Sequence, residues 1–117
     1  MSNQLLENLK AVRNHLATPD RWTQHSLARN ADGMSGLLPE SGAAVCWCLF
    51  GALRAVELPH WSRAAVVSTL AKLIEPEAKD LHNNGVAADI VIAFNDADNR
   101  KHGEVLALLD KAIANAS

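Results

Sequence analysis

The sequence is poor in the patterns that mark metal, redox and disulfide-bonded proteins. Only two of its 117 residues are cysteine, Cys46 and Cys48, and no CxxC pair or His-x-His cluster is present. Positions two apart on a helix point to nearly opposite sides, so we expect two free thiols and no disulfide. Without a recognisable ligand cluster, we also expect neither a metal site nor a cofactor.

Clustered charge and long apolar runs are missing as well. The formal net charge is -2 and the Lys and Arg residues are scattered, which argues against nucleic-acid binding and against attraction to anionic membranes. The longest apolar run, over 43–56, falls short of the roughly 20 residues of a membrane span. The opening MSNQLLENLKAVRNH lacks the features of a secretory signal. These absences predict a cytoplasmic protein.

Apolar residues, by contrast, make up 49% of the chain. The length fits one domain, 1–117, that is large enough to bury a core. The stretch AAVCWCLFGALRAV over 43–56 has no polar face, so we predict a central helix buried on nearly all sides, with Ser41 as its N-cap. Gly51 within a helix costs about 1 kcal/mol relative to alanine, and we expect the close approach of another helix to be the reason.

The rest of the chain predicts a mainly α fold of about five helices around this central one. Apolar residues at helical spacing indicate helices over 3–17, 62–75, 86–94 and 103–115. A strand is the rival interpretation of 86–94, which is rich in β-branched residues. The glycine-rich segment before the central helix contains an Asp-Gly pair and predicts a small β-hairpin or an irregular insertion at 26–38, with strands near 26–29 and 35–38.

Three stretches stand out as a set: WTQHSLARNADG at 22–33, WCLFGAL at 47–53, and FND at 94–96 followed by HGEVLALLD at 102–110. In this order they resemble a family of small uncharacterised bacterial and phage proteins, a domain of unknown function. The family has W-C-x-x-G-A-L and F-N-D…H-x-E-V-L signatures. The resemblance covers about residues 20–114. It implies an intracellular accessory domain without an assigned activity.

Two positions depart from the family pattern. An aspartate of the family is Asn30 here, and the threonine before the histidine is Lys101. A threonine there would form a capping box with Glu104, which a lysine cannot do. We therefore expect the last helix to start at Asp98 or Asn99 instead.

Cys48, His102 and Asp96 are the residue types of a thiol active site, in which a thiolate attacks, a histidine acts as base and a carboxylate orients it. Asn95 or Gln24 would then supply an oxyanion donor. Cys48, however, lies in the middle of the most apolar run, where a cysteine is typically inert packing. A small cysteine-dependent hydrolase or transferase using Cys48 and His102 is therefore the alternative function.

The polar residues of the three stretches gather on segment 23–38 and on turn 95–102. Irregular segments often carry binding residues. We therefore predict one binding surface from these two places, made of Gln24, His25, Arg29, Asn95, Asp96 and His102.

Each of these residues also has a structural interpretation. Arg29 is suited to hold a carboxylate or phosphate in a fork, or it pairs with an acidic residue of this chain. Asn95 would end its helix in a left-handed conformation, and Asp96 would bond to nearby backbone donors. A neutral His102 would bond to Asp96.

Taken together, these features favour a non-enzymatic binding or interaction module of bacterial or phage origin. Its partner would be a protein or a small anionic ligand. A homodimer is a further expectation for either function, because so apolar a chain can leave an exposed patch.

Overall fold

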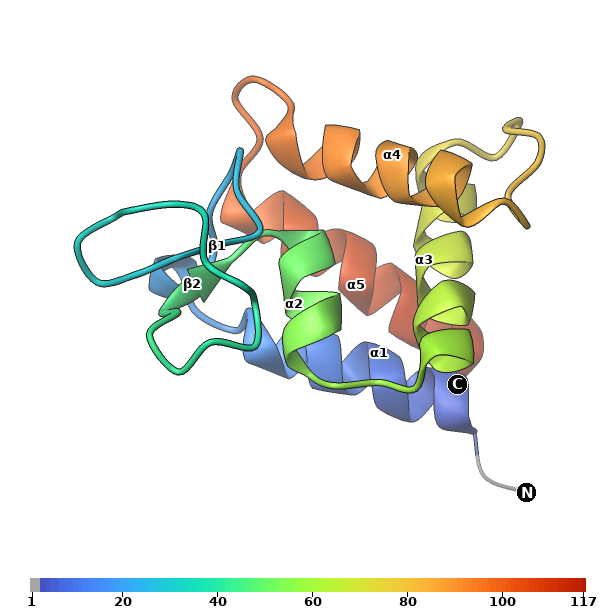
Figure 1. Cartoon of the computed structure of the whole chain (residues 1–117). Coiled ribbons are helices and arrows are strands. Elements are labelled where there is room, and N and C mark those ends of the chain that lie inside the picture. Colours follow the sequence, from blue (N-terminus) through green and yellow to red (C-terminus); the bar gives the residue numbers. More distant parts are fainter. Residues whose placement is uncertain (1–2) are drawn as a thin grey trace.

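The predicted helices are all present in the computed structural model, which describes residues 3–117 (Figure 1). The helices are α1 (Gln4–His15), α2 (Leu49–Ala55), α3 (His60–Ile74), α4 (Asn84–Asp96) and α5 (His102–Ala116). A 3-10 turn, Pro19–Arg21, and the strands β1 (Ala28–Arg29) and β2 (Cys46–Trp47) complete the elements of the described chain. The mainly α fold class, with a small β element, is thereby confirmed.

The helices pack in two pairs around α2. α1 lies against α5, α3 lies against α4, and α2 contacts α1, α3 and α4 (Figure 1). Each helix contributes fully buried apolar side chains to one core, among them Leu9, Leu53, Leu70, Val91 and Leu109. Burial of each such side chain contributes about 1.5–3 kcal/mol. No helix within residues 3–117 has the length and apolar character needed to cross a membrane.

The central helix is shorter than predicted, and the prediction is wrong for residues 43–48. The backbone of β2 pairs antiparallel with β1, with Ala28 opposite Trp47 and Arg29 opposite Cys46. Because this ladder satisfies the polar backbone groups, the apolar run enters the core without being helical. The prediction that the helix is buried is confirmed within α2, whose buried residues are Leu49, Gly51, Ala52 and Leu53.

The start of α2 is also set differently. The Sγ atom of Cys48 accepts a hydrogen bond from the backbone N–H of Gly51 at 3.2 Å, so Cys48 is the N-cap. The predicted cap, Ser41, instead accepts a hydrogen bond from Ala43 within a loop. The close approach expected at Gly51 exists, but the neighbour is backbone: a Cβ atom on Gly51 would lie 1.9 Å from the carbonyl oxygen of Leu27.

The insertion at 26–38 is irregular, and the hairpin prediction for it is wrong. The partner of β1 is β2, and no strand forms near 35–38. A tight turn follows β1, in which the Oδ1 atom of Asn30 accepts hydrogen bonds from the N–H groups of Asp32 and Met34, both at 3.0 Å. The oxygen of an aspartate, which the resemblance in sequence would place here, could accept the same two bonds.

The last two helices are confirmed, with one correction. The segment 86–94 lies within α4, so the strand interpretation is wrong; the side chain of Asn83 caps this helix by accepting from the N–H of Gly85 at 2.9 Å. α5 begins at His102 and not at Asp98 or Asn99. Its first turn is closed by the carboxylate of Glu104, which accepts the N–H of Lys101 at 2.8 Å.

Candidate functional site

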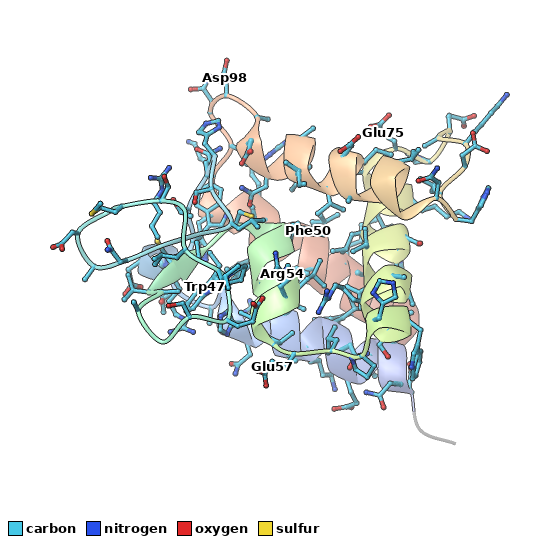
Figure 2. The ribbon with its side chains drawn as sticks, viewed as in Figure 1. Trp47, Phe50, Arg54, Glu57, Glu75 and Asp98 are labelled. Carbon is cyan, nitrogen blue, oxygen red and sulfur yellow. The ribbon has the colours of Figure 1, made fainter. Side chains whose placement is uncertain are left out.

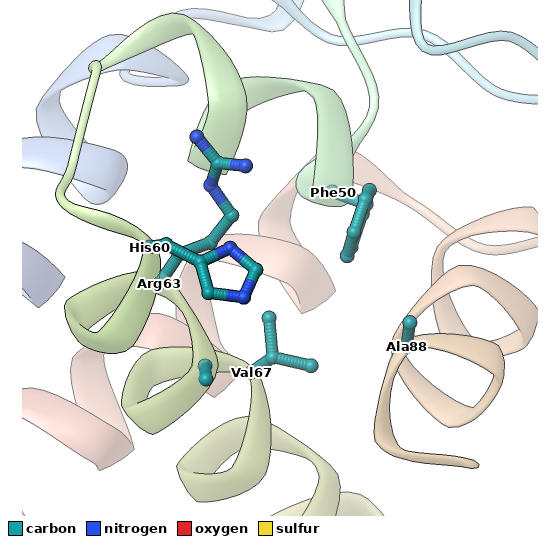
Figure 3. Close-up of a pocket in the computed structure, with 6 residues that line it drawn as sticks. Phe50, His60, Arg63, Val67 and Ala88 are labelled. Carbon is teal, nitrogen blue, oxygen red and sulfur yellow. The ribbon is translucent and has the colours of Figure 1, made fainter. Parts of the chain in front are cut away.

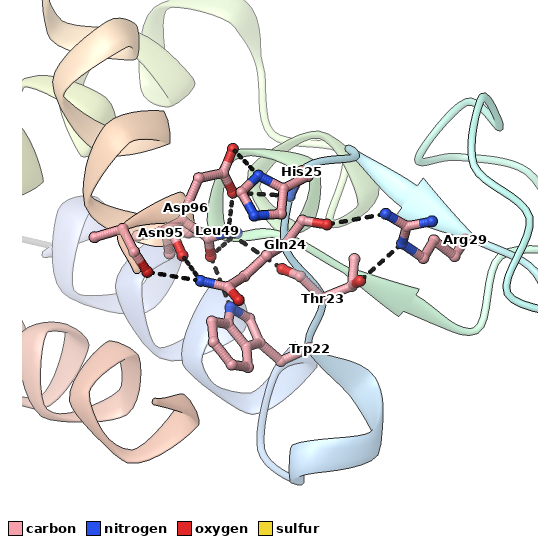
Figure 4. Close-up of polar contacts among 9 residues, drawn as sticks. Trp22, Thr23, Gln24, His25, Arg29, Leu49, Asn95 and Asp96 are labelled. Atoms are coloured by element: carbon pink, nitrogen blue, oxygen red, sulfur yellow. Dashed lines mark hydrogen bonds and ion pairs between the residues drawn. The ribbon is translucent and has the colours of Figure 1, made fainter. Parts of the chain in front are cut away.

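The two places singled out in the sequence meet at a buried amide, that of Asn95 (Figure 4). Its Oδ1 atom accepts the indole N–H of Trp22 at 2.7 Å and the backbone N–H of Leu49 at 3.0 Å. Its Nδ2 atom donates to the carbonyl of Thr23 at 3.1 Å and to Asp96 Oδ1 at 2.9 Å. Asn95 is fully buried within α4, so the interpretation of a left-handed helix end is wrong for this residue.

The neighbouring polar residues extend this network to the surface. The Nε2 atom of Gln24 donates to the carbonyls of Asn95 at 2.9 Å and Ala97 at 3.1 Å. The backbone N–H of His25 donates to Asp96 Oδ1 at 2.9 Å. Asp96 thus bonds to a backbone donor as predicted, but the donor lies 71 positions away in the sequence and not in the local turn. Segment 22–25 is thereby fixed against the end of α4.

His25 is the exposed member of this network. Its backbone has a φ of 64°, in the left-handed region that costs a non-glycine residue energy. Its side chain is 64% exposed and places Nδ1 3.8 Å from Asp96 Oδ2. The hydrogen bond from its N–H to Asp96 holds it in this conformation, with the imidazole facing solvent.

Arg29 bonds to neutral acceptors of its own chain, not to the acidic residues considered from the sequence. Its guanidinium donates to Thr23 Oγ1 at 3.0 Å and to the carbonyls of Gly33 and Gln24, both at 3.1 Å. These bonds tie the turn after β1 to segment 22–25. Arg29 therefore holds the base of the loop that follows.

His102 lies outside this network. Its Nε2 atom is 2.6 Å from the carbonyl of Leu16 and must carry the proton to donate there. Its ring lies beside that of Trp22, with 6.2 Å between centroids. The expected bond to Asp96 is absent from the contacts of the described residues; His102 instead joins the start of α5 to the end of α1.

Cys48 lines a surface pocket of about 220 Å³ with His25, Ser26, Leu27, Ile92 and Asp96. Cys48 was expected to act with His102, but the histidine in this pocket is His25. Cys48 is 4% exposed. Burial raises the pKa of its thiol, the bond from Gly51 opposes that rise, and the charge of Asp96 adds to it. Within residues 3–117, no cluster of three or more His, Cys, Asp or Glu residues could hold a metal ion.

The loop over 30–45, which we call the β1–β2 loop, has exposed apolar side chains that were not among the predicted binding residues. Met34 is 64% exposed, Leu38 63% and Val45 44%. The loop extends away from the helices in Figure 1. A signal was available in the sequence, since apolar residues in a segment without helical or strand spacing have no core face to occupy.

The fold and this network define a small, mainly helical domain in which a buried asparagine joins three separate segments of the chain. The chain belongs to a family of unknown function, DUF6197, whose family model matches residues 1–115. The predicted resemblance to an uncharacterised family is thereby confirmed. No curated protein and no solved structure shows a significant match to the chain.

Proposed function

We propose that this protein is a non-enzymatic interaction module that binds another protein through the β1–β2 loop. The observation that carries the proposal is the exposure of Met34, Leu38 and Val45 on one loop. Of the four exposed large apolar side chains in the described residues, three lie on this loop, and contiguous exposed apolar surface is typical of a protein–protein contact. Methionine suits such a contact because its flexible side chain adapts to a partner.

The loop is held in place before any partner arrives. Arg29 anchors its first turn, and the buried indole N–H of Trp47 donates to the carbonyl of Pro39 at 2.9 Å. An ion pair of 3.1 Å between Glu40 and Arg54 ties its second half to α2. Figure 2 shows Trp47 at the base of the loop, next to α2. A preorganised loop loses less conformational entropy on binding than a free one.

The polar network around Asn95 has a structural role in this proposal, because it holds the segment that anchors the loop. Gln24, Asn95 and Asp96 direct hydrogen bonds inward and fix segment 22–25, from which Arg29 in turn is held. Five of the six predicted residues, Gln24, His25, Arg29, Asn95 and Asp96, thus belong to one bonded unit, and His102 lies outside it. The contribution of this unit to binding is to position the loop, and His25 remains the polar side chain open to a partner. On the basis of the sequence resemblance, the proposal includes a cytoplasmic location and a bacterial or phage origin.

The test compares a loop variant with a matched surface variant. Met34→Ser combined with Leu38→Ser removes two exposed apolar side chains, and Trp61→Ser removes another, 70% exposed, from α3. Both proteins should keep the wild-type circular dichroism spectrum. In quantitative pull-downs from the native host, a partner that is reproducibly captured by the wild type and by Trp61→Ser should be lost with the loop variant.

A partner retained by the loop variant would contradict the proposal. Size-exclusion chromatography coupled to light scattering measures the molar mass and so tests whether the partner is a second copy of this chain. If the wild type is a dimer and the loop variant a monomer, the loop is a self-association surface.

A cysteine-dependent hydrolase or transferase is the second candidate, in a modified form. The observation that favours it is that Cys48, His25 and Asp96 line one pocket. His25 would be the base, in place of His102, and Asp96 would orient it across 3.8 Å. The raised pKa of the buried thiol counts against this candidate. Native alkylation of Cys48 decides between the two.

A further inference from the structure

A second pocket lies where α2, α3 and α4 meet (Figure 3). It has a volume of about 110 Å³, and its lining consists of Phe50, His60, Arg63, Ala64, Val67 and Ala88. Phe50 and Ala88 face His60 and Val67 across the space in Figure 3. The lining therefore combines apolar walls with one guanidinium and one imidazole, and it contains no acidic residue.

Arg63 is set apart from other arginines by its lack of partners. Arg13, Arg54 and Arg100 each pair with a carboxylate, and Arg21 and Arg29 donate hydrogen bonds to neutral acceptors. The Arg63 side chain takes part in none of the ion pairs or hydrogen bonds among residues 3–117. Its Nε atom is buried without a hydrogen-bond partner in the described structure. A buried donor left unpaired is unfavourable. Because Nε itself has almost no contact with solvent, an acceptor from outside the chain would bond to the terminal guanidinium nitrogens, which take part in no hydrogen bond or ion pair of the described residues.

We propose that this pocket binds a small monocarboxylate with a compact apolar body, whose carboxylate is held by Arg63 and His60. The carboxylate accepts from the guanidinium, which presents its N–H groups in a fork that matches two oxygens. The imidazole of His60 supplies a further donor. The apolar body lies against Phe50, Val67 and Ala88.

Size limits the ligand. An apolar cavity of about 150 Å³ holds one benzene ring. A pocket of about 110 Å³ is smaller than that but opens to solvent, so it takes in part of a single ring, with the rest of the ring and its carboxylate at the mouth. The small volume excludes long fatty acids. Polyanions are excluded because Arg63 and His60 are the only residues of the lining that can carry a positive charge.

The experiment uses benzoate as the probe and benzamide, its neutral counterpart of the same shape, as the control ligand. Titration of the full ¹⁵N-labelled chain should shift the backbone amide signals of Ala64, Val67 and Ala88. Benzoate should bind at least about tenfold more tightly than benzamide, since a hydrogen bond to a charged group is worth that factor or more.

Three variants complete the test. Arg63→Gln should weaken benzoate binding at least about tenfold, whereas Lys72→Gln, which removes the same charge from an exposed position of α3, should leave it unchanged. Ala88→Leu fills the pocket from α4 and should abolish binding of both ligands. This variant keeps the proposal testable if Arg63→Gln does not fold.

Four results would overturn the proposal. They are equal affinity for benzoate and benzamide, unchanged benzoate affinity in Arg63→Gln or in Ala88→Leu, signal shifts confined to residues outside the pocket, and the absence of any shift at millimolar benzoate. None of them bears on the β1–β2 loop, so this proposal and the proposed function succeed or fail separately.

Discussion

Trp22 and Asn95 are joined by a hydrogen bond of 2.7 Å, from the indole Nε1 to the amide Oδ1, although they lie 73 positions apart in the sequence. The same oxygen accepts the first backbone N–H of α2, from Leu49. One buried side chain therefore holds segment 22–25, α2 and α4 together. The stability of the domain should depend on this residue more than on any solvent-exposed polar group.

Asn95→Ala should lower the free energy of unfolding by about 3 kcal/mol or more, because it leaves several buried polar groups without partners. Trp22→Phe keeps an aromatic ring but removes the N–H and part of the packed indole, so it should cost about 1–3 kcal/mol. Urea unfolding followed by circular dichroism measures both. Asn115→Ala, at an exposed position of α5, is the control and should change stability by less than about 0.5 kcal/mol. Equal effects of Asn95→Ala and Asn115→Ala would refute the role given to Asn95.

Gly51→Ala should destabilise the domain by several kcal/mol, although alanine favours helix by about 1 kcal/mol over glycine. The added Cβ would lie 1.9 Å from the carbonyl oxygen of Leu27, a backbone atom that cannot move aside alone. Gly103→Ala is the matched control in the first turn of α5, since nothing lies within 4 Å of the position that its Cβ would take. It should be neutral or stabilising by up to about 1 kcal/mol. The unfolding temperature should fall in Gly51→Ala and stay the same or rise in Gly103→Ala. A Gly51→Ala protein as stable as the wild type would contradict the packing described.

Cys48 should resist alkylation in the folded protein. Burial raises the pKa of its thiol, so little thiolate is present at pH 8. In a Cys46→Ser background, iodoacetamide should modify Cys48 at least about tenfold more slowly in buffer than in 8 M urea. The reverse variant, Cys48→Ser, gives the alkylation rate of Cys46, which is partly exposed. Rapid native alkylation of Cys48 that is slowed by His25→Ala would instead favour the thiol enzyme.

His15 should make stability depend on pH below neutrality. Burial, followed by the charge of Arg21, lowers the pKa of its imidazole. The unfolded chain therefore binds the proton more readily, and stability present above about pH 6.5 is lost as the pH falls through the folded-state pKa. His15→Gln should flatten this decline in urea midpoints between pH 7 and 5. His82→Gln, at an exposed position, should leave the slope unchanged, and an unaltered slope in His15→Gln would exclude this cause.

Most of the helical framework could be predicted from the sequence. Apolar residues at helical spacing suffice for α1, α3, α4 and α5, because each buries one stripe of side chains. The start of α2 could not be predicted in this way, since a short apolar run fits a buried strand or a buried helix equally well. What makes Cys46 and Trp47 a strand is their pairing with Ala28 and Arg29, and no local pattern encodes a partner beyond a loop.

The candidate site was predictable as a location and not as a set of bonds. The sequence placed Gln24, Asn95 and Asp96 together on one surface, and the structure joins them. It did not indicate that Asn95 would be fully buried, because an asparagine at the end of an apolar helix usually faces solvent. The pocket beside Arg63 left no sequence signal either, since it exists only through the meeting of three helices.

The hydrogen bond that Asn95 accepts from the first N–H of α2 also sets an order of assembly. The amide of Leu49 finds its acceptor on α4, so a nascent chain that has emerged only as far as residue 90 lacks the group that fixes the beginning of α2. Segments that are synthesised early, such as α2, therefore cannot reach their final packing until α4 has been synthesised. Amide exchange at Leu49 should accordingly report opening of the whole domain and not local fraying of a seven-residue helix.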